Sequence, residues 1–264
     1  MLIERILDSA DPRIAIYRDL KDKNLRRDNA FIVEGKFILQ TLLTRAQFEI
    51  SSVLITEDRL LPLNQILTGV PAGVPIYIST PEIMAGIAGY HVHRGILAAG
   101  KANGSIFSLP TYLNNKKRLA ILSNISNPDN IGAIFRNAAG LGIEGIVLDD
   151  QCCSPLYRKA IRVSMGATLV LPWLQTSSIE EIILQFKEMN FTIYALSLQS
   201  AVALEDTEFA SYSAFLFGEE AHGLPPHIQI QCRPVTIPMS DGTDSLNVAA
   251  TSAIVFNAAR RHQM

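Results

Sequence analysis

Residues 119–148 read LAILSNISNPDNIGAIFRNAAGLGIEGIVL, and this stretch decides the fold. Its two apolar runs, Leu119–Ser123 and Ile146–Leu148, have the length and composition of buried strands. Between them, Asn130–Ala139 has helical spacing of apolar residues, and Asp129 or Asn130 is able to cap the helix. A strand, a helix and a strand in this order predict part of a mostly parallel sheet covered by helices on both faces.

The same alternation continues to the end of the chain. Ligands of such sheets bind in the loops that follow the carboxyl ends of the strands, so we expect the function to lie there. The further elements that the pattern predicts are a helix over Leu156–Met165, a strand over Thr168–Pro172, a helix over Ile179–Glu188, strands over Phe191–Leu196, Phe215–Gly218 and Val235–Ile237, and a last helix from about Ser245 to Arg261.

The first hundred residues predict a small α/β sandwich. Polar and turn-forming residues such as Asn103-Gly104-Ser105 then favour a linker. We therefore expect an N-terminal domain over 1–103, a linker over 104–117 and a second α/β domain over 118–264. The N-terminal elements that we expect are a helix opened by Asp11-Pro12, strands over Ala30–Val33, Val53–Thr56, Ile76–Ser79 and Ile96–Gly100, and helices over Phe37–Leu43 and Pro81–Ile87.

Composition excludes several classes of protein. The chain has 264 residues, a net charge of −2 and 48% hydrophobic residues, as globular proteins do. Its apolar runs are too short to span a bilayer, and no apolar leader opens the chain. The three cysteines show no C-x-x-C spacing, so we expect free thiols, no metal and a cytoplasmic protein.

The glycines at 140–145 match G-x-G-x-x-G, the pattern of dinucleotide-binding loops. Such a loop must follow a strand and open a helix, whereas this one follows the predicted helix and precedes a strand. We interpret it as a glycine turn at a helix C-terminus, which leaves a nicotinamide-dependent oxidoreductase as a remote alternative.

Three other segments each follow a predicted strand. The first carries Asn130 and Arg136, the second is Gly218–Pro225, and the third runs from Ile237 to Val248. Each has a structural explanation of its own: Arg136 as a solvated helix residue, or Ser245 as an N-cap. Three together favour one binding site.

These segments resemble the motifs of the SpoU (TrmH-type) branch of the SPOUT RNA methyltransferases. The resemblance covers about residues 116–264. The matching patterns are N-x-G-x-x-x-R at Asn130–Arg136, R-x-S-x-G-A at Arg162–Ala167, G-x-E-x-x-G-L at Gly218–Leu224, and I-P-M…S-L-N-V at Ile237–Val248.

The resemblance implies a deep trefoil knot, a homodimer, and methylation of a ribose 2′-hydroxyl in RNA with S-adenosylmethionine as cofactor. It implies that Gly218, Ile237 and Leu246 contact the cofactor. The catalytic residues that it implies are Asn130, Arg136, Glu220, Ser245 and Asn247.

Arg136 is the usual choice of base in this family. A guanidinium has a pKa above about 12 and stays protonated. We therefore expect Arg136 to stabilise the developing alkoxide or to hold an adjacent phosphate, while the proton leaves by another route. The sulfonium already makes the methyl group electrophilic, so the chemistry needs no metal.

The segment from Asp11-Pro12-Arg13 to Lys36 resembles, more loosely, the substrate-binding domain of rRNA ribose methyltransferases. This favours ribosomal over transfer RNA as the partner. Cations suit phosphate contacts. The residues that we expect to bind RNA are Lys21, Lys23, Arg26, Arg27 and Arg162.

Two residues depart from the family pattern. Asp241 stands where glycine is usual, with Gly242 displaced by one position, and Glu219 stands where a small residue is usual. They keep open the alternative of a catalytically impaired RNA-binding or ribosome-assembly protein of the same fold. A tRNA ribose methyltransferase is the other alternative.

Overall fold

The computed structural model of the chain describes residues 1–18, 25, 29–88, 95–102, 109–176, 178–198, 202–219, 223–242 and 245–261. The chain folds into two compact units. Unit 1 comprises Met1–Gly104 and Leu156–Val170, and unit 2 comprises Ser105–Pro155 and Leu171–Met264.

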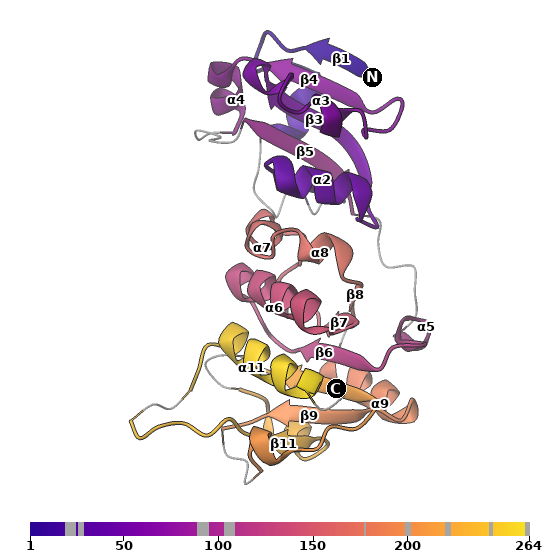
Figure 1. Cartoon of the computed structure of the whole chain (residues 1–264), viewed down its shortest axis with the longest axis vertical. Coiled ribbons are helices and arrows are strands. Elements are labelled where there is room, and N and C mark those ends of the chain that lie inside the picture. The colour runs from indigo at the N-terminus through magenta and orange to yellow at the C-terminus, as the bar shows by residue number, and fades with distance from the viewer. Residues whose placement is uncertain are drawn as a thin grey trace. The chain divides into compact units, whose positions relative to one another are not determined.

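Unit 1 is built on a mixed five-stranded sheet (Figure 1). In spatial order the strands are β1 (Leu2–Arg5), β4 (Pro75–Ser79), β3 (Glu49–Thr56), β5 (Ile96–Lys101) and β2 (Ala30–Glu34). β4 is parallel to both β1 and β3, while β5 is antiparallel to β3 and β2. The helical segments of this unit are η1 (Pro12–Tyr17), α2 (Lys36–Thr44), η2 (Glu57–Arg59), α3 (Asn64–Leu67), α4 (Pro81–Ala88), α7 (Arg158–Val163) and α8 (Ala167–Val170).

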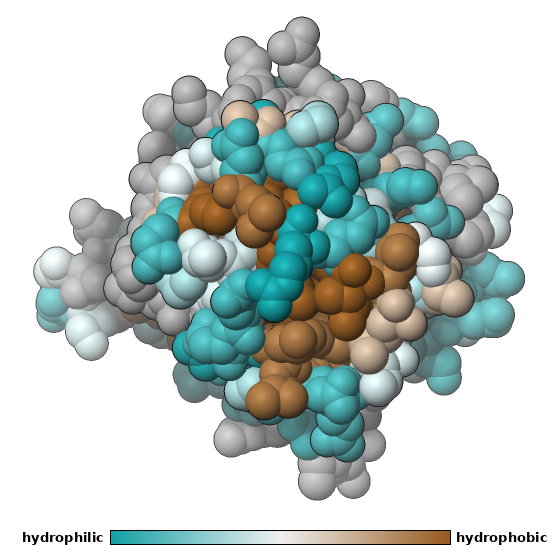
Figure 2. Space-filling view, turned by 90° about the horizontal axis from the view of Figure 1, so that it is seen from above, coloured by the Kyte–Doolittle hydropathy of each residue, from teal (hydrophilic) through white to brown (hydrophobic). Residues whose placement is uncertain are grey.

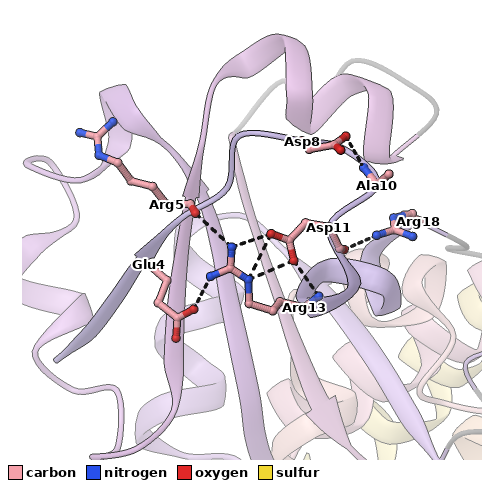
Figure 3. A network of polar contacts seen from close by, with 7 residues as sticks. All are labelled: Glu4, Arg5, Asp8, Ala10, Asp11, Arg13 and Arg18. Atoms are coloured by element: carbon pink, nitrogen blue, oxygen red, sulfur yellow. Dashed lines mark hydrogen bonds and ion pairs between the residues drawn. The ribbon is translucent and has the colours of Figure 1, made fainter.

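An ion-pair network fixes the N-terminal segment of unit 1 (Figure 3). The Arg13 guanidinium contacts Asp11 through Nη2 at 2.5 Å and Nε at 3.0 Å, and Glu4 through Nη1 at 2.5 Å. It also donates to the carbonyl of Arg5. Hydrogen bonds and charge from Arg13 lower the pKa of the Asp11 carboxyl to about 2. Arg13 is therefore engaged within the fold.

Unit 1 leaves several large apolar side chains exposed. Figure 2 shows apolar patches separated by hydrophilic side chains at the end where β1 and α4 lie. β1 is an edge strand of only four residues, which limits pairing with another chain. The exposed set in unit 1 includes Met1, Leu2, Ile3, Leu7, Phe37 and Leu61.

Unit 2 is built on a six-stranded sheet in which every pairing is parallel. In spatial order its strands are β11 (Arg233–Val235), β9 (Thr192–Leu196), β10 (Ser213–Phe217), β6 (Arg118–Leu122), β7 (Gly145–Leu148) and β8 (Trp173–Gln175). The predicted parallel α/β sheet is confirmed. Its helical segments are α5 (Leu109–Leu113), α6 (Pro128–Leu141), α9 (Ile179–Glu188), η3 (Leu204–Asp206), α10 (Pro226–Gln229) and α11 (Val248–Arg261).

Helix α6 begins earlier than predicted. The Asn127 side chain accepts a hydrogen bond from the amide of Asp129, and Pro128 occupies the first helical position. The prediction of Asp129 or Asn130 as cap is therefore wrong. The helix ends at Gly142, whose φ of 80° is left-handed, so the glycine turn is confirmed.

The predicted strand over Thr168–Pro172 is wrong. Residues 167–170 form the short helix α8, and the strand begins at Trp173. Helix α7 also stops short of its prediction, because Met165 and Gly166 both take positive φ. Leu169 accepts a hydrogen bond from the amide of Gln47, so tertiary contacts within unit 1 override the β-branched composition here.

The interval predicted as a linker contains helix α5. Its residues Leu109, Tyr112 and Leu113 are buried in the core of unit 2. The Tyr112 hydroxyl donates to the carbonyls of Pro172 at 2.8 Å and Ile146 at 3.2 Å, so α5 is anchored to the sheet. At least this part of the interval is a packed element.

No helix among the described residues is both long and apolar enough to cross a membrane. Over the same residues, no three His, Cys, Asp or Glu side chains come together in a way that suits a metal ion.

Candidate active site

A cavity of about 390 Å³ opens at the carboxyl ends of β9, β10 and β11 in unit 2. Its position matches the expectation for a parallel sheet. Its walls combine apolar side chains with polar groups, and the Glu219 carboxylate is the charged group among the described lining residues. These residues are Leu196, Ser197, Leu198, Phe217, Gly218, Glu219, Gly223, Leu224, Pro226, Gln229, Val235, Ile237, Met239, Ser245, Leu246, Val248 and Thr251.

The loop after β10 folds back on itself at one wall of this cavity. The amide of Gly223 donates to the carbonyl of Glu219 at 2.8 Å, and the two residues form an isolated bridge. A Cβ atom on Gly218 would lie 2.7 Å from the carbonyl carbon of Gly223. Only glycine permits this close approach of the two backbone segments.

A buried carboxylate holds the loops after β6 and β7. Asp149, 4% exposed, accepts hydrogen bonds from the Ser123 hydroxyl at 2.7 Å and from the amides of Asn124, Gln151 and Cys152. These bonds satisfy donors that the turns leave without a strand partner. Asp149 therefore fixes two turns at the carboxyl edge of the sheet.

Asn124 extends this arrangement to the cavity. Its φ is 56°, a left-handed conformation that asparagine tolerates. Its Nδ2 donates to Glu219 Oε2 at 2.8 Å. A chain of hydrogen bonds thus runs from Asp149 through Asn124 to the carboxylate in the cavity wall.

Helices α6 and α11 bring two of the predicted catalytic residues together. Asn247 Nδ2 donates to Asn130 Oδ1 at 3.1 Å, and Asn247 Oδ1 accepts from the amide of Ala249 at 2.9 Å. Asn247 therefore caps α11, and the alternative of Ser245 as N-cap is wrong. The two helices lie side by side in Figure 1, and Asn137 Nδ2 donates to the Ala249 carbonyl and the Ser252 hydroxyl between them.

Arg136 lies on α6 with its side chain exposed, and it is not among the residues that line the cavity. Within the described part of the chain, no side chain or backbone group forms a hydrogen bond or an ion pair with its guanidinium. None of the described groups occupies its five N–H donors, and its permanent charge suits contact with a phosphate or an alkoxide.

The other predicted site residues fall into three groups. Gly218, Ile237, Ser245 and Leu246 line the same cavity. Arg162 is exposed on α7, in unit 1. The remaining predicted residues lie outside the described residues and are Lys21, Lys23, Arg26, Arg27 and Glu220.

Sequence reasoning missed Asp149 and Asn124. Each directly follows a predicted strand, so the rule that pointed to the other loops also applied to them. Neither belongs to one of the family motifs. The end of β9, which supplies Leu196, Ser197 and Leu198 to the cavity, was missed for the same reason.

Comparisons with known proteins agree on one family. The model of the SpoU rRNA Methylase family matches residues 117–257. An uncharacterised tRNA/rRNA methyltransferase of Mycobacterium tuberculosis is 34% identical over 96% of this chain and 90% of its own length. The 23S rRNA (guanosine-2′-O-)-methyltransferase RlmB of Escherichia coli is 26% identical over 87% of this chain and 98% of its own length.

Solved structures show the same fold over the whole chain. An rRNA methyltransferase from Sinorhizobium meliloti with bound AdoMet superposes with a TM-score of 0.86 at 20% identity, covering 99% of both chains.

Proposed function

Because the chain belongs to the SpoU rRNA methylase family, we propose that it methylates a ribose 2′-hydroxyl of structured RNA, with ribosomal RNA as substrate. The family makes the chain an RNA methyltransferase that uses S-adenosylmethionine. One observation carries the proposal for the site. Gly218, Ile237 and Leu246, which the family motifs implicate in cofactor binding, all line one cavity at the carboxyl ends of parallel strands.

The residues of this cavity fit S-adenosylmethionine. The cavity's volume of about 390 Å³ lies in the range of small-molecule sites, and the apolar side chains in its walls suit an adenine ring. The Glu219 carboxylate suits a positively charged ligand, so this departure from the family pattern is compatible with the cofactor. When bound, S-adenosylmethionine supplies an electrophilic methyl group on a positively charged sulfur.

The chain's own residues then have to orient the ribose hydroxyl and stabilise the charge that develops on its oxygen. We assign the second role to Arg136, whose guanidinium has no partner among the described residues. Asn130 and Asn247, joined at 3.1 Å, supply fixed amide groups for the first role, with the hydroxyl of Ser245. Glu220 completes the proposed set on the strength of its motif.

Ribosomal RNA is favoured by two findings. The family description names rRNA, and the Escherichia coli relative is named for 23S rRNA. A tRNA substrate is the second candidate, since the Mycobacterium relative is named for both.

The trefoil knot and the homodimer belong to the same proposal. β10 lies between β9 and β6 in the sheet, and α11, the last helix of unit 2, packs on α6, which precedes β7 to β11 in the chain. Such crossing connections support a knot. Sedimentation of the purified protein tests the dimer.

We further propose that residues 1–103 bind the substrate, with Lys21, Lys23, Arg26 and Arg27 on phosphates. Replacing Lys23, Arg26 and Arg27 together is expected to weaken RNA binding and to flatten its salt dependence. An unchanged slope contradicts this assignment.

The decisive experiment compares Arg136→Ala with Arg45→Ala, an exposed arginine on unit 1. Ribosomal RNA from a strain lacking the gene is incubated with labelled S-adenosylmethionine and then hydrolysed in alkali. A 2′-O-methyl group protects the adjacent phosphodiester, so label in alkali-resistant dinucleotides identifies ribose methylation.

We expect Arg136→Ala to lower methyl transfer at least about a hundredfold and to leave cofactor affinity within about twofold in calorimetry. Arg45→Ala should match wild type. Wild-type activity in Arg136→Ala would refute the assignment. A wild-type chain that binds RNA and transfers no methyl group would support the impaired RNA-binding alternative.

A further inference from the structure

A second cavity lies wholly within unit 1 and has a volume of about 570 Å³. It is formed by the first turns of α2, the turn that follows β3, and the start of β5. The residues that line it are Lys36, Phe37, Gln40, Arg59, Pro62, Leu63 and Ile96.

The charged residues among these are both cations. Lys36 is exposed, and the described part of the chain offers its ammonium group no hydrogen bond or ion pair. Arg59 Nε lies 3.1 Å from Asp58 Oδ2, but the buried Nε–H forms no aligned hydrogen bond. Asp58 offsets one of the two charges and leaves the cavity net positive and short of an acceptor.

An aromatic ring stands beside these cations. Helix α2 buries Ile38, Leu39 and Leu42 against the unit, whereas Phe37 is 55% exposed. Phe37 and Gln40 are three residues apart in the helix and therefore lie on neighbouring positions of its surface. The exposed phenyl ring next to two cations and an amide does little to stabilise the fold, because its apolar area stays in water.

We propose that this cavity binds an unpaired nucleotide of RNA. Phe37 stacks on the base, Lys36 and Arg59 contact the flanking phosphates, and the Gln40 amide hydrogen-bonds the base edge. Splayed-out bases are held in this way in single-stranded RNA, with stacking on an aromatic ring and cations along the backbone. The inference rests on the proposed RNA methyltransferase function and adds a recognition site that no family motif of unit 2 contains.

The stacking contact is tested with a tryptophan reporter. The chain has one tryptophan, Trp173, which lies in unit 2. In the double variant Trp173→Phe/Phe37→Trp, the fluorescence therefore reports the proposed site alone. We expect a short single-stranded oligoadenylate to quench it, and a blunt duplex RNA of the same length to leave it unchanged.

Two further probes identify the source of the nucleotide. Free 5′-AMP is expected to quench only at much higher concentration, because it lacks the second phosphate contact. Quenching by AMP as strong as by oligoadenylate overturns the RNA assignment in favour of a free nucleotide. Binding of polyglutamate in place of oligoadenylate overturns it in favour of an acidic peptide.

Affinity for oligoadenylate separates the roles of the residues. Phe37→Ala should weaken binding about fivefold or more and leave the salt slope unchanged. Phe37→Trp should keep the affinity of the wild type, because it retains an aromatic ring. Lys36→Gln and Arg59→Gln should each reduce the slope of log K against log salt by about 0.7. Arg45→Gln, at the other end of α2, is the matched control and should do neither.

The outcomes distinguish this proposal from the proposed function. If Phe37→Ala binds as wild type does while the wild type methylates RNA, the nucleotide site is wrong and the methyltransferase assignment stands. If the wild type transfers no methyl group but Phe37-dependent binding persists, the nucleotide site stands and the proposed activity is wrong.

Discussion

In each unit one carboxylate holds a turn of the chain, and the two carboxylates differ in the kind of partner that they bind. Asp11 of unit 1, whose side chain is 15% exposed, accepts from the amide of Arg13 and pairs with the Arg13 guanidinium, whose side chain is 42% exposed (Figure 3). Asp149 of unit 2 is 4% exposed and accepts from the Ser123 hydroxyl and three backbone amides. The guanidinium of Arg13 can turn to water, whereas the three amides that bond to Asp149 cannot.

This difference predicts that the stability of unit 2 depends more on its carboxylate than the stability of unit 1 does. An exposed ion pair contributes little, because water replaces either partner at small cost. Removing a buried acceptor leaves several donors without hydrogen bonds, and each such donor costs about 1–3 kcal/mol. The loops that form the candidate active site therefore rest on the interaction that is harder to replace.

The largest effect is expected for Asp149→Ala. It leaves the amides of Asn124, Gln151 and Cys152 without their acceptor. We expect the free energy of unfolding to fall by about 3 kcal/mol. Trp173 lies in β8 of unit 2, so its fluorescence in a urea titration reports this unit.

Asp149→Asn is the matched control, because it keeps the shape and one acceptor oxygen. It should lose less stability than Asp149→Ala. Both variants should weaken S-adenosylmethionine binding, since Asn124 would no longer hold Glu219 in the cavity wall. If Asp149→Ala lowers the free energy of unfolding by less than about 1 kcal/mol, Asp149 contributes no more to stability than an exposed ion pair does.

An intermediate effect is expected for Gly145→Ala, which tests a buried contact of unit 2 that involves no charge. The new Cβ would overlap the Tyr112 hydroxyl, which bonds to the carbonyls of Pro172 and Ile146. We expect a loss of about 2 kcal/mol in the same titration. Tyr112→Phe removes the overlapping hydroxyl, so the double variant should lose less than the sum of the two singles.

The sequence predicts the parallel sheet of unit 2 well and the bounds of single elements less well. Strong apolar runs separated by helical spacing specify a parallel sheet, and that sheet is present. Thr168–Pro172 has strand composition, but its first three residues belong to helix α8, which contacts residues more than a hundred positions earlier, such as Gln47. No local pattern encodes such a contact.

The site shows the same division. Gly218, Ile237 and Leu246 belong to contiguous motifs, and they come together because parallel strands end at one edge. Asp149 acts through backbone amides of other turns, which leave no side-chain pattern in the sequence. In unit 1, Lys36 and Arg59 share a cavity although they are distant in sequence, so only the fold reveals them.

A smaller effect is expected for Asn247→Ala, which removes the cap of α11 and the bond to Asn130. We expect the free energy of unfolding to fall by about 1 kcal/mol, which is typical of the removal of an N-cap. Asn247→Asp keeps the acceptor for Ala249 and lacks the donor for Asn130. It should therefore lose less stability than Asn247→Ala, because the cap remains, and should transfer methyl groups more slowly; equal rates would exclude a role for the Asn130 contact.

The smallest effect is expected for Asp11, and it depends on pH. Arg13 lowers the folded-state pKa of this carboxyl from 3.8 to about 2. Its stabilising contribution is therefore complete above about pH 4 and is lost as the pH falls through 2, while Arg13 stays protonated throughout.

Cleavage by pepsin, which is active over this range, measures opening of the N-terminal segment. Cleavage of an unstructured peptide corrects for the pH dependence of pepsin itself. Wild type should be cleaved faster at pH 2 than at pH 4, and Asp11→Asn should be cleaved at similar, raised rates at both. A wild-type rate that does not change between these pH values would mean that the network of Figure 3 holds this segment less than the other contacts of η1 do.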